Sequence, residues 1–320
     1  MSKKIGIITS GGDAPGMNAA IRAVTRRGIS LGYQIIGIKR GFKGLIKGEF
    51  VNLTSRSVSG IINTGGTILH TGRCPEIKTK DGMKKTIDSI KKLELKGLII
   101  IGGDGSLAAG YALSKYGIKI INIAASIDND IYGTDETIGY DTALNTAVEA
   151  IDKIRNTATS HNRIFVVEIM GREHGFLTVD VGLAAGCETI MVPEIKVNIN
   201  KVAKELKEGK EKGKTSEIIA FAEGCGSLSD FGNKIERLTG FEVRVSTLGY
   251  IQRGGSPTAR TRILASRFGY SAINLFDEKK TNVLIGITDG KISAMPIQNA
   301  IKYEKKFNTK TFKILRTLSI

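Results

Sequence analysis

The segment Ser126-Ile127-Asp128-Asn129-Asp130 holds the residue types best suited to chemistry in this chain. It follows an apolar run, and no Lys or Arg lies between Asp128 and Asp141, although the chain has 47 Lys and Arg against 31 Asp and Glu. If the segment is extended, Asp128 and Asp130 share one face. One carboxylate can then act as a general base toward a hydroxyl while the other faces a metal ion. An Asx-turn with helix caps is the alternative for part of this acidic stretch.

Two glycine-rich turns form the next candidate site. "LIIIGGDGSLAA" matches the nucleotide-binding pattern G-x-G-x-x-A from Gly103 to Ala108, a pattern shared by many strand-to-helix turns. Asp104 would repel a bare phosphate, whereas Mg²⁺ is commonly held by a carboxylate together with substrate phosphates, so we predict that Asp104 faces a metal. The turn "GGDAPGMN" leads into a helix whose N-terminus can bind phosphate, and a simple tight turn explains it equally well.

The positions of five arginines indicate an anionic substrate. They lie beside glycines or at strand ends, whereas the helix-like segments carry mainly Lys. A guanidinium binds phosphate through two parallel hydrogen bonds, which an ammonium cannot do. Although any one of them suits a surface ion pair equally well, the five together favour a phosphorylated substrate: Arg73, Arg163, Arg172, Arg244 and Arg253.

The elements that must position these residues alternate along the chain. Apolar strand-like runs end in polar or glycine-rich tips and are followed by helical patterns, and they cover Lys4–Thr9, Gly97–Ile101, Ile118–Ala124, Arg163–Ile169, Ser216–Ala222 and Glu242–Leu248. This alternation predicts a parallel α/β architecture. The carboxyl ends of the strands would then converge on a ligand-binding crevice. We expect a domain boundary near Thr137–Gly139, before a long helix.

Composition narrows the class of protein. With 41% hydrophobic and 24% charged residues, the chain of 320 residues is in the globular range. It has no apolar run of membrane-spanning length and no signal-peptide pattern, and its three cysteines lack metal spacing, so we expect a cytoplasmic protein. The net charge of +16 attracts anions in general, but 6% aromatic residues and no Trp make nucleic acid an unlikely partner.

Taken together, these motifs resemble bacterial ATP-dependent 6-phosphofructokinases over essentially the whole chain. The matching stretches occur in family order: "TSGGDAPGMNAAIR", "IGGDGS", "SIDND", "GTDETIGYDTA", "VVEIMGR", "GCE", "AEG", "LGYIQRGG" and "RILASR". The resemblance implies two Rossmann-like three-layer αβα domains with mainly parallel sheets and an active site in the cleft between them. It places a larger ATP-binding domain at 1–138 plus 252–304, and a smaller sugar-phosphate-binding domain at 139–251 plus 305–320.

The resemblance implies transfer of the ATP γ-phosphoryl to the 1-hydroxyl of D-fructose 6-phosphate, with Mg²⁺ near Asp104. Asp128 would be the general base, beside Ser126 and Asp130, and two arginines, Arg73 and Arg172, would stabilise the transferred phosphoryl. ATP would contact Gly12, Arg73, Cys74, Gly103, Asp104, Gly105 and Ser106. The sugar phosphate would contact Ser126, Ile127, Asp128, Arg163, Met170, Gly171, Arg172, Glu223, Arg244, Tyr250, Ile251, Gln252 and Arg253.

The resemblance also implies regulation and assembly. Arg163 and Arg244 would reach the active site of a neighbouring subunit in a homotetramer. An ADP-type effector would bind residues from several segments, namely Arg22, Ala23, Val24, Thr25, Arg26, Ser55, Arg56, Ser57, Val58, Ser59, Gly60, Arg155, Gly186, Cys187, Glu188, Lys212, Lys214, Thr215 and Ser216.

The chain departs from the family pattern at several of these positions. Ala124-Ala125-Ser126 replaces Pro-Gly-Thr, Tyr250 replaces a His, Phe42 replaces a Tyr near the adenine, and Ser55 replaces an effector-site Arg. We therefore expect weakened sugar-phosphate affinity and an altered ADP response. Gly105 and Ala125 stand where pyrophosphate-dependent relatives have Asp and Lys, so ATP is favoured as donor.

Three alternatives stay open at this stage. Another kinase with a "GGDG" turn, such as an NAD or lipid kinase, would not need "SIDND", "MGR" and "QRGG" together. A regulatory or nucleic-acid-binding relative would fit the +16 charge but would not need Asp104, Asp128 and Arg172. A divergent kinase acting on another phosphosugar is the third.

Overall fold

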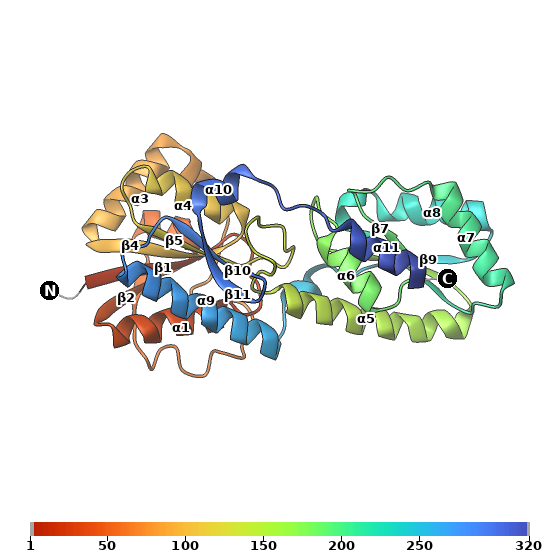
Figure 1. The fold of residues 1–320 in the computed structure, drawn as a ribbon, viewed down its shortest axis with the longest axis horizontal. Coiled ribbons are helices and arrows are strands. Elements are labelled where there is room, and N and C mark those ends of the chain that lie inside the picture. The colour runs from red at the N-terminus through yellow and green to blue at the C-terminus, as the bar shows by residue number, and fades with distance from the viewer. Residues whose placement is uncertain (1–2, 319–320) are drawn as a thin grey trace. The chain divides into compact units, whose positions relative to one another are not determined.

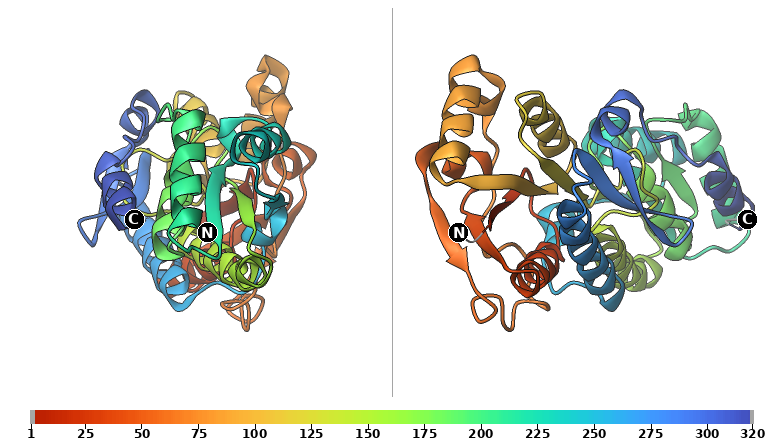
Figure 2. Two further views of the ribbon diagram at one scale, coloured as in Figure 1. Left: turned by 90° about the vertical axis from the view of Figure 1, so that its right-hand side faces the viewer. Right: turned by 60° about the vertical axis from the view of Figure 1, so that its left-hand side comes forward.

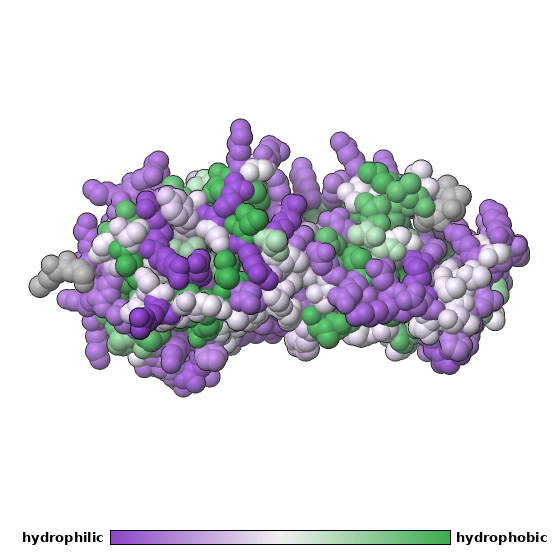
Figure 3. Space-filling model, turned by 90° about the horizontal axis from the view of Figure 1, so that it is seen from below, coloured by the Kyte–Doolittle hydropathy of each residue, from purple (hydrophilic) through white to green (hydrophobic). Residues whose placement is uncertain are grey.

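The computed structural model describes residues 3–318, which form two compact units. Unit 1 contains residues 3–127, Ile131–Thr142 and Arg253–Lys305, and unit 2 contains Asp128–Asp130, Ala143–Gln252 and 306–318. No helix within 3–318 is long and apolar enough to cross a membrane. The surface face in Figure 3 is largely hydrophilic, with separate apolar patches, as expected for Lys-rich helix faces exposed to water.

Unit 1 is built on a seven-stranded sheet in the order β11-β10-β5-β4-β1-β2-β3. Its central strands are parallel, while β3 and β11 pair antiparallel at the two edges. The strands are β1 (Lys3–Ser10), β2 (Tyr33–Ile38), β3 (Phe50–Leu53), β4 (Leu95–Gly102), β5 (Ile120–Ala124), β10 (Val283–Thr288) and β11 (Lys291–Pro296). The run Leu98–Ile101 is completely buried because helices cover both faces of the sheet.

The helices of unit 1 form the two outer layers. Helices α1 and α9 cover one face of the sheet and α3, α4 and α10 cover the other (Figures 1 and 2). Gly269 lets α9 approach α1 closely, since a Cβ there would lie 2.7 Å from the carbonyl oxygen of Ala20. The elements are α1 (Met17–Ser30), α2 (Gly41–Lys47), η1 (Pro75–Lys78), α3 (Lys80–Lys92), α4 (Asp104–Ser114), α9 (Ala259–Asp277) and α10 (Ile297–Lys302).

Unit 2 contains a four-stranded parallel sheet in the order β7-β8-β6-β9. Phe221 and Phe231 lie in the apolar layer that β6 and β8 share with α7 and α8. The C-terminal helix α11 packs on α6. The elements are α5 (Tyr140–His161), β6 (Ile164–Ile169), α6 (Phe176–Ala184), β7 (Thr189–Met191), α7 (Ile199–Glu211), β8 (Glu217–Ala222), η2 (Glu223–Cys225), α8 (Leu228–Thr239), β9 (Val243–Thr247), η3 (Gly249–Arg253) and α11 (Thr309–Leu318).

The predicted α/β class with mainly parallel sheets is confirmed. Each of the six strand-like runs contains a strand, whereas β2, β3, β7, β10 and β11 were not predicted. The chain passes from unit 1 to unit 2 after Thr142, inside α5, rather than near Thr137–Gly139. Asp128–Asp130 belong to unit 2, whereas the predicted domain ranges place them in the ATP-binding domain.

Candidate active site

The strongest pair of candidate catalytic groups is Asp128 and Arg172, both in unit 2. Arg172 Nε lies 3.3 Å from Asp128 Oδ2. The side chain of Asp128 is only 5% exposed, whereas that of Arg172 is 57% exposed. A nearly buried carboxylate needs such a partner because removing a charge from water is costly. The carboxylate is thus shielded from water, with a long and exposed cationic side chain beside it.

Asp128 and Asp130 do not share one face of an extended segment, so that prediction is wrong. Residues 127 and 128 form a turn, and Asn129 has a φ of +53°, in the left-handed region. Asn tolerates this conformation better than most residues because its short amide can bond locally. Asp128 is buried and Asp130 half-buried. The two carboxylates therefore have different surroundings, and the burial of Asp128 makes it the stronger candidate for proton transfer.

The loop Met170–Arg172, which follows β6, is held by two side chains. Glu223 Oε2 accepts hydrogen bonds from the backbone N–H groups of Gly171 at 3.3 Å and Arg172 at 3.1 Å. Gln252 Oε1 accepts one from Met170 N at 3.3 Å. Arg172 itself has a φ of +52°, which a residue with a side chain adopts only when its surroundings hold it there. The loop is thus fixed in the conformation that brings Arg172 to Asp128.

Gln252 was predicted to contact the sugar phosphate, but its side chain is fully buried. Its Oε1 is used by Met170 N, and its Nε2 donates to the carbonyl oxygen of Gly249 at 3.1 Å. The side-chain amide therefore links the Met170–Arg172 loop to η3 and has no exposed surface for a ligand. The contact of Gln252 with substrate stays a prediction, and the position of its side chain indicates support of the loop.

We expect Gln252→Met to lower kcat by on the order of tenfold or more with a smaller change in KM. Methionine fills a similar volume but offers Met170 N no acceptor, so the loop that carries Arg172 loosens, and small displacements of catalytic groups are costly. Steady-state kinetics with a thermal melt checks this. Gln298→Met, on the exposed side of α10, is the matched control. A change in melting temperature with unaltered kcat would contradict the role assigned to Gln252.

In unit 1, the turn after β4 has the features of a phosphate site. Helix α4 begins at Asp104, and no side chain caps its N-terminus, which leaves backbone N–H groups for a ligand. A Cβ on Gly105 would meet nothing within 4 Å, so the backbone there is open to close approach. Asp104 is exposed at this helix end. The side chain of Ser106 is buried and donates to Ser10 O at 3.0 Å.

The residues available for a metal fit an ion that arrives with phosphate. Within residues 3–318 no cluster of three or more His, Cys, Asp or Glu could hold a metal by itself. Mg²⁺ binds typically through one or two carboxylates, water and substrate phosphates. An exposed Asp104 at the uncapped start of α4 supplies one such carboxylate beside a place for phosphate.

The turn after β1 contains an ion pair that the sequence analysis did not single out. Arg253 Nη2 lies 2.5 Å from Asp13 Oδ1. A Cβ on Gly12 would lie 3.0 Å from the same nitrogen, so the glycine leaves room for the guanidinium. Asp13 is the only acid in "SGGDAPG", a signal that could have identified it. Thr71 Oγ1 also donates to Gly11 O at 2.9 Å, which ties this turn to the loop that contains Arg73 and Cys74.

The Ala124-Ala125-Ser126 segment packs against the Gly103 turn inside unit 1. Ala125 N donates to Gly102 O at 3.2 Å, and Ser126 N donates to Ile138 O at 3.1 Å. A Cβ on Gly103 would lie 3.8 Å from the Cβ of Ser126. Ala125 is 2% exposed, so its methyl group lies in the interior while its N–H group still donates to Gly102 O.

Arg163 and Arg244 are not brought to the Met170–Arg172 loop of the same chain. Both pair with Glu242, and Arg163 Nε lies 2.6 Å from its Oε2. They lie where β6 and β9 begin, whereas the loop follows the end of β6. Six strand residues separate the two ends by about 20 Å. The hydrogen bond from Arg163 also holds the pKa of Glu242 below its usual value. Tyr250 and Ile251 are exposed, at 78% and 56%.

The predicted effector residues fall into a group in each unit. In unit 2, Arg155 Nη1 lies 2.9 Å from Glu188 Oε1, and Glu188 Oε2 accepts from Ile218 N at 2.7 Å. Lys212, Lys214, Thr215 and Ser216 lie on the turn after α7. In unit 1, Arg22, Ala23 and Arg26 lie on α1, and Ser55, Arg56, Ser57, Ser59 and Gly60 lie on the loop after β3.

Some of the residues predicted to bind the effector have buried side chains. Val24, Thr25 and Val58 are completely buried within unit 1, where they pack in the interior. Cys187 is 1% exposed, and burial raises the pKa of its thiol to about 12. Helical periodicity explains the buried side chains on α1, because a continuous range across a helix includes its buried face.

The fold defines a class of protein: an α/β protein of two units, one with an uncapped helix N-terminus after β4 and the other with the Asp128–Arg172 pair. A family model described as phosphofructokinase matches residues 4–276. An ATP-dependent 6-phosphofructokinase of Clostridium tetani is 50% identical over 99% of both chains, and one of Halalkalibacterium halodurans is 48% identical over 99% of this chain and all of that one. The chain therefore belongs to the phosphofructokinase family.

Solved structures agree with this assignment. The crystal structure of Pichia pastoris phosphofructokinase in the T-state superposes with a TM-score of 0.89 and 34% identity. The match covers 99% of this chain and 36% of the yeast chain. This chain thus spans about a third of the length of that larger protein.

Proposed function

We propose that this protein is an ATP-dependent 6-phosphofructokinase. It transfers the ATP γ-phosphoryl to the 1-hydroxyl of D-fructose 6-phosphate and releases ADP and fructose 1,6-bisphosphate, a cytoplasmic step of glycolysis. The observation that carries the proposal is the shielded Asp128 carboxylate paired with the exposed, backbone-fixed Arg172. The curated relatives named for this activity match the chain over nearly its full length, which supports the choice of substrates.

In the proposed reaction, Asp128 accepts the proton of the 1-hydroxyl as the oxygen attacks the γ-phosphorus. The guanidinium of Arg172 lies against Asp128 in the free chain, and its 57% exposed side chain can turn to the incoming phosphoryl group. That movement leaves Asp128 Oδ2 open to the hydroxyl. Phosphoryl transfer depends chiefly on positioning and charge neutralisation, so a single base and well-placed cations are sufficient.

The donor side of the reaction is assigned to unit 1. Phosphate oxygens of ATP would bind the open N-terminus of α4, with Gly103 and Gly105 allowing the backbone to approach. Asp104 would hold Mg²⁺, which neutralises charge on the β- and γ-phosphates when it is bound. Arg73, which is exposed beside Cys74, is assigned to the phosphoryl group as a second cation.

We also propose a homotetramer with shared active sites and an ADP-type effector site. Arg163 and Arg244 lie too far from the Met170–Arg172 loop to serve their own chain, and both are at least partly exposed around Glu242. A role in a neighbouring subunit accounts for that position. The Arg155–Glu188 pair and the lysines after α7 would receive the effector phosphates. Sedimentation of the purified protein and ADP titration test these two parts separately.

The experiment that tests the activity is coupled detection of fructose 1,6-bisphosphate formed from fructose 6-phosphate and Mg²⁺, with either ATP or pyrophosphate supplied as donor. Turnover with ATP that disappears in Asp128→Ala supports the proposal. Phosphate release from pyrophosphate at a comparable kcat/KM would contradict the donor, since Gly105 and Ala125 offer pyrophosphate no special partner. Absence of turnover with both donors would overturn the assignment as a kinase.

We expect Tyr250→His to lower KM for fructose 6-phosphate by about threefold to tenfold at pH 6.5. A histidine at this exposed position can carry positive charge near its ordinary pKa, and a charged hydrogen bond to phosphate is stronger than a neutral one. The gain should fade at pH 8 because the imidazole is then neutral. Tyr270→His on α9, also exposed, serves as control. An unchanged KM at pH 6.5 would contradict the idea that Tyr250 weakens affinity.

A further inference from the structure

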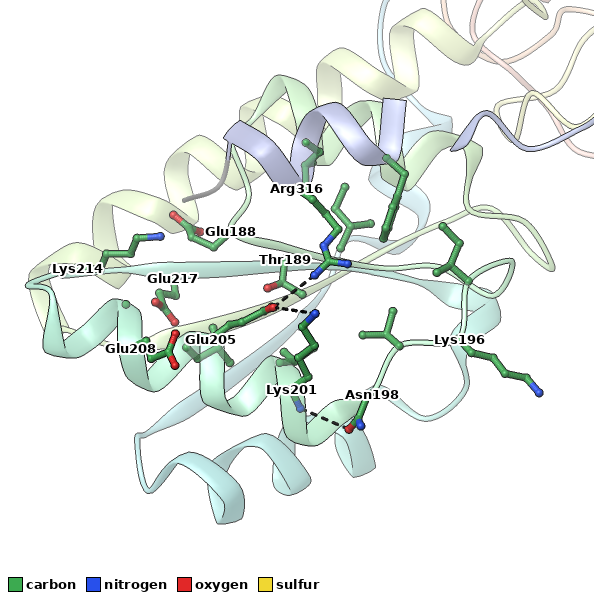
Figure 4. Close-up of a pocket in the computed structure, with 18 of the residues that line it drawn as sticks. Glu188, Thr189, Lys196, Asn198, Lys201, Glu205, Glu208, Lys214, Glu217 and Arg316 are labelled. Carbon is green, nitrogen blue, oxygen red and sulfur yellow. Dashed lines mark hydrogen bonds and ion pairs between the residues drawn. The ribbon is translucent and has the colours of Figure 1, made fainter. Parts of the chain in front are cut away.

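Unit 2 contains a cavity of about 470 Å³ outside the residues assigned to catalysis. It lies between the edge strand β7, α7 and α11 (Figure 4). Apolar walls come from Ile190, Val202, Leu206, Phe312 and Leu315. A volume of this size is within the usual range for small-molecule sites. A ligand whose apolar part has roughly ten non-hydrogen atoms would fit between these walls.

One carboxylate in the lining of this cavity has an oxygen atom without a hydrogen-bond donor in the described part of the chain. Glu217 begins β8, lines the cavity, and is 1% exposed. Its Oε2 atom has no hydrogen-bond partner among residues 3–318. A buried carboxylate oxygen without a donor is costly, so such atoms are rare in folded proteins. Gly209 of α7 lies directly against the other oxygen, since a Cβ there would be 2.3 Å from Oε1.

The other carboxylates around the cavity already have cations beside them. Glu205 Oε1 lies 3.4 Å from Arg316 and 3.9 Å from Lys201, as drawn in Figure 4. Glu208 lies 3.7 Å from Lys204. Glu188 is paired with Arg155. Glu217 is therefore the position at which a ligand would gain most by bringing a hydrogen-bond donor.

We propose that this cavity is a binding site for a small amphipathic amine, whose ammonium group pairs with Glu217 while its apolar body lies between α7 and α11. An ammonium group is the best complement because it brings both donors and the opposite charge, and charge-assisted hydrogen bonds are about twice as strong as neutral ones. The apolar body gains by leaving water for the walls around Leu206 and Phe312.

The cavity overlaps the proposed ADP-type effector site only in part. Glu188, Lys212 and Lys214 belong to both, but the cavity lining contains none of the other predicted effector residues. The effector residues would receive an anion, whereas Glu217 requires a donor. The inference does not depend on the proposed kinase activity, because its test measures binding and needs no turnover.

Protons should compete with the amine at Glu217. Burial and the nearby carboxylate of Glu188 raise the pKa of Glu217 to about 7, while Lys214 after α7 and Lys210 on α7 oppose that rise. The carboxylate form, which pairs with ammonium, is thus a minority at pH 6 and the majority at pH 8. An amine should bind about tenfold more tightly at pH 8 than at pH 6.

We expect 4-phenylbutylamine to bind the full-length protein with Kd of about 1–5 mM at pH 8. Ligand-observed NMR titration should show at least tenfold weaker binding of 4-phenylbutanol and 4-phenylbutyrate, which have the same apolar body. Glu217→Gln should weaken amine binding by about tenfold and remove its pH dependence. Glu208→Gln is the matched control, because Glu208 lines the same cavity but is partly exposed and paired, and it should change Kd less than twofold.

Equal binding of the three probes, no binding of the amine at 20-fold the expected Kd, or an unchanged affinity in Glu217→Gln would each overturn the proposal. Thermal melting at two pH values measures separately how the substitution affects folding. The folded protein holds the Glu217 proton up to about pH 7, above the ordinary value of 4.5, so wild-type stability falls as pH rises between those values. Glu217→Gln should therefore melt higher than wild type at pH 8 and not at pH 4.5.

Discussion

Asp128→Asn is expected to lower kcat by about 10²–10⁴-fold or more while KM for ATP changes little. Asparagine preserves the size of the side chain. Its carbonyl oxygen can still accept a hydrogen bond from Arg172, so a hydrogen bond to a neutral amide replaces the 3.3 Å ion pair. The amide cannot take a proton from the sugar hydroxyl. The substitution therefore removes the base while it keeps the surrounding structure.

The matched control for this experiment is Asp130→Asn. Both carboxylates lie in "SIDND", but only Asp128 is nearly buried and paired with Arg172, so the control should lose much less of kcat. Coupled ADP release at saturating substrates measures both variants. A larger loss in the Asp130 variant would reverse the assignment of the base. A thermal melt of each variant verifies that the turn at residues 127 and 128 is intact.

The local features of the site could be predicted from the chain, because each is encoded by neighbouring residues. A strand followed by "GGDGS" and a helix predicts an open helix N-terminus, and the structure has α4 starting at Asp104 without a side-chain cap. The family resemblance placed Asp128 and Arg172 in one site. It could not show how they meet, since the loop geometry depends on Glu223 and Gln252, which lie 51 and 82 residues from their backbone partners.

Burial explains most of what the sequence analysis missed. Gln252 in "GYIQRGG" and Glu217 in "KTSEII" look like ordinary polar residues beside basic ones. Their burial arises only when η3 folds under the Met170–Arg172 loop and when β8 takes an inner place in its sheet, between β7 and β6. Burial likewise places the side chains of Val24 and Val58, two of the predicted effector residues, in the interior of unit 1. A side chain's role depends on which of its atoms the fold leaves accessible.

Arg172→Lys is expected to lower kcat by about 10²–10³-fold with little effect on stability. Lysine keeps a positive charge and can adopt the same backbone, whose φ of +52° Glu223 holds through two N–H groups. An ammonium cannot form the paired hydrogen bonds of a planar guanidinium to phosphoryl oxygens. The loss should therefore fall on the transition state, when charge develops on the transferred group, more than on binding of either substrate.

Two comparisons make this prediction specific. Arg260→Lys is the matched control, since Arg260 also pairs with a carboxylate, Glu136, but has no assigned part in the reaction, so its kcat should stay within about twofold of wild type. Arg172→Ala should regain part of its activity when guanidinium is added at low concentration, whereas methylammonium should restore less. If the Arg172→Lys variant supported wild-type turnover, or if the two cations rescued the alanine variant equally, Arg172 would contribute only charge. The planar fork of the guanidinium would then have no part in stabilising the phosphoryl group.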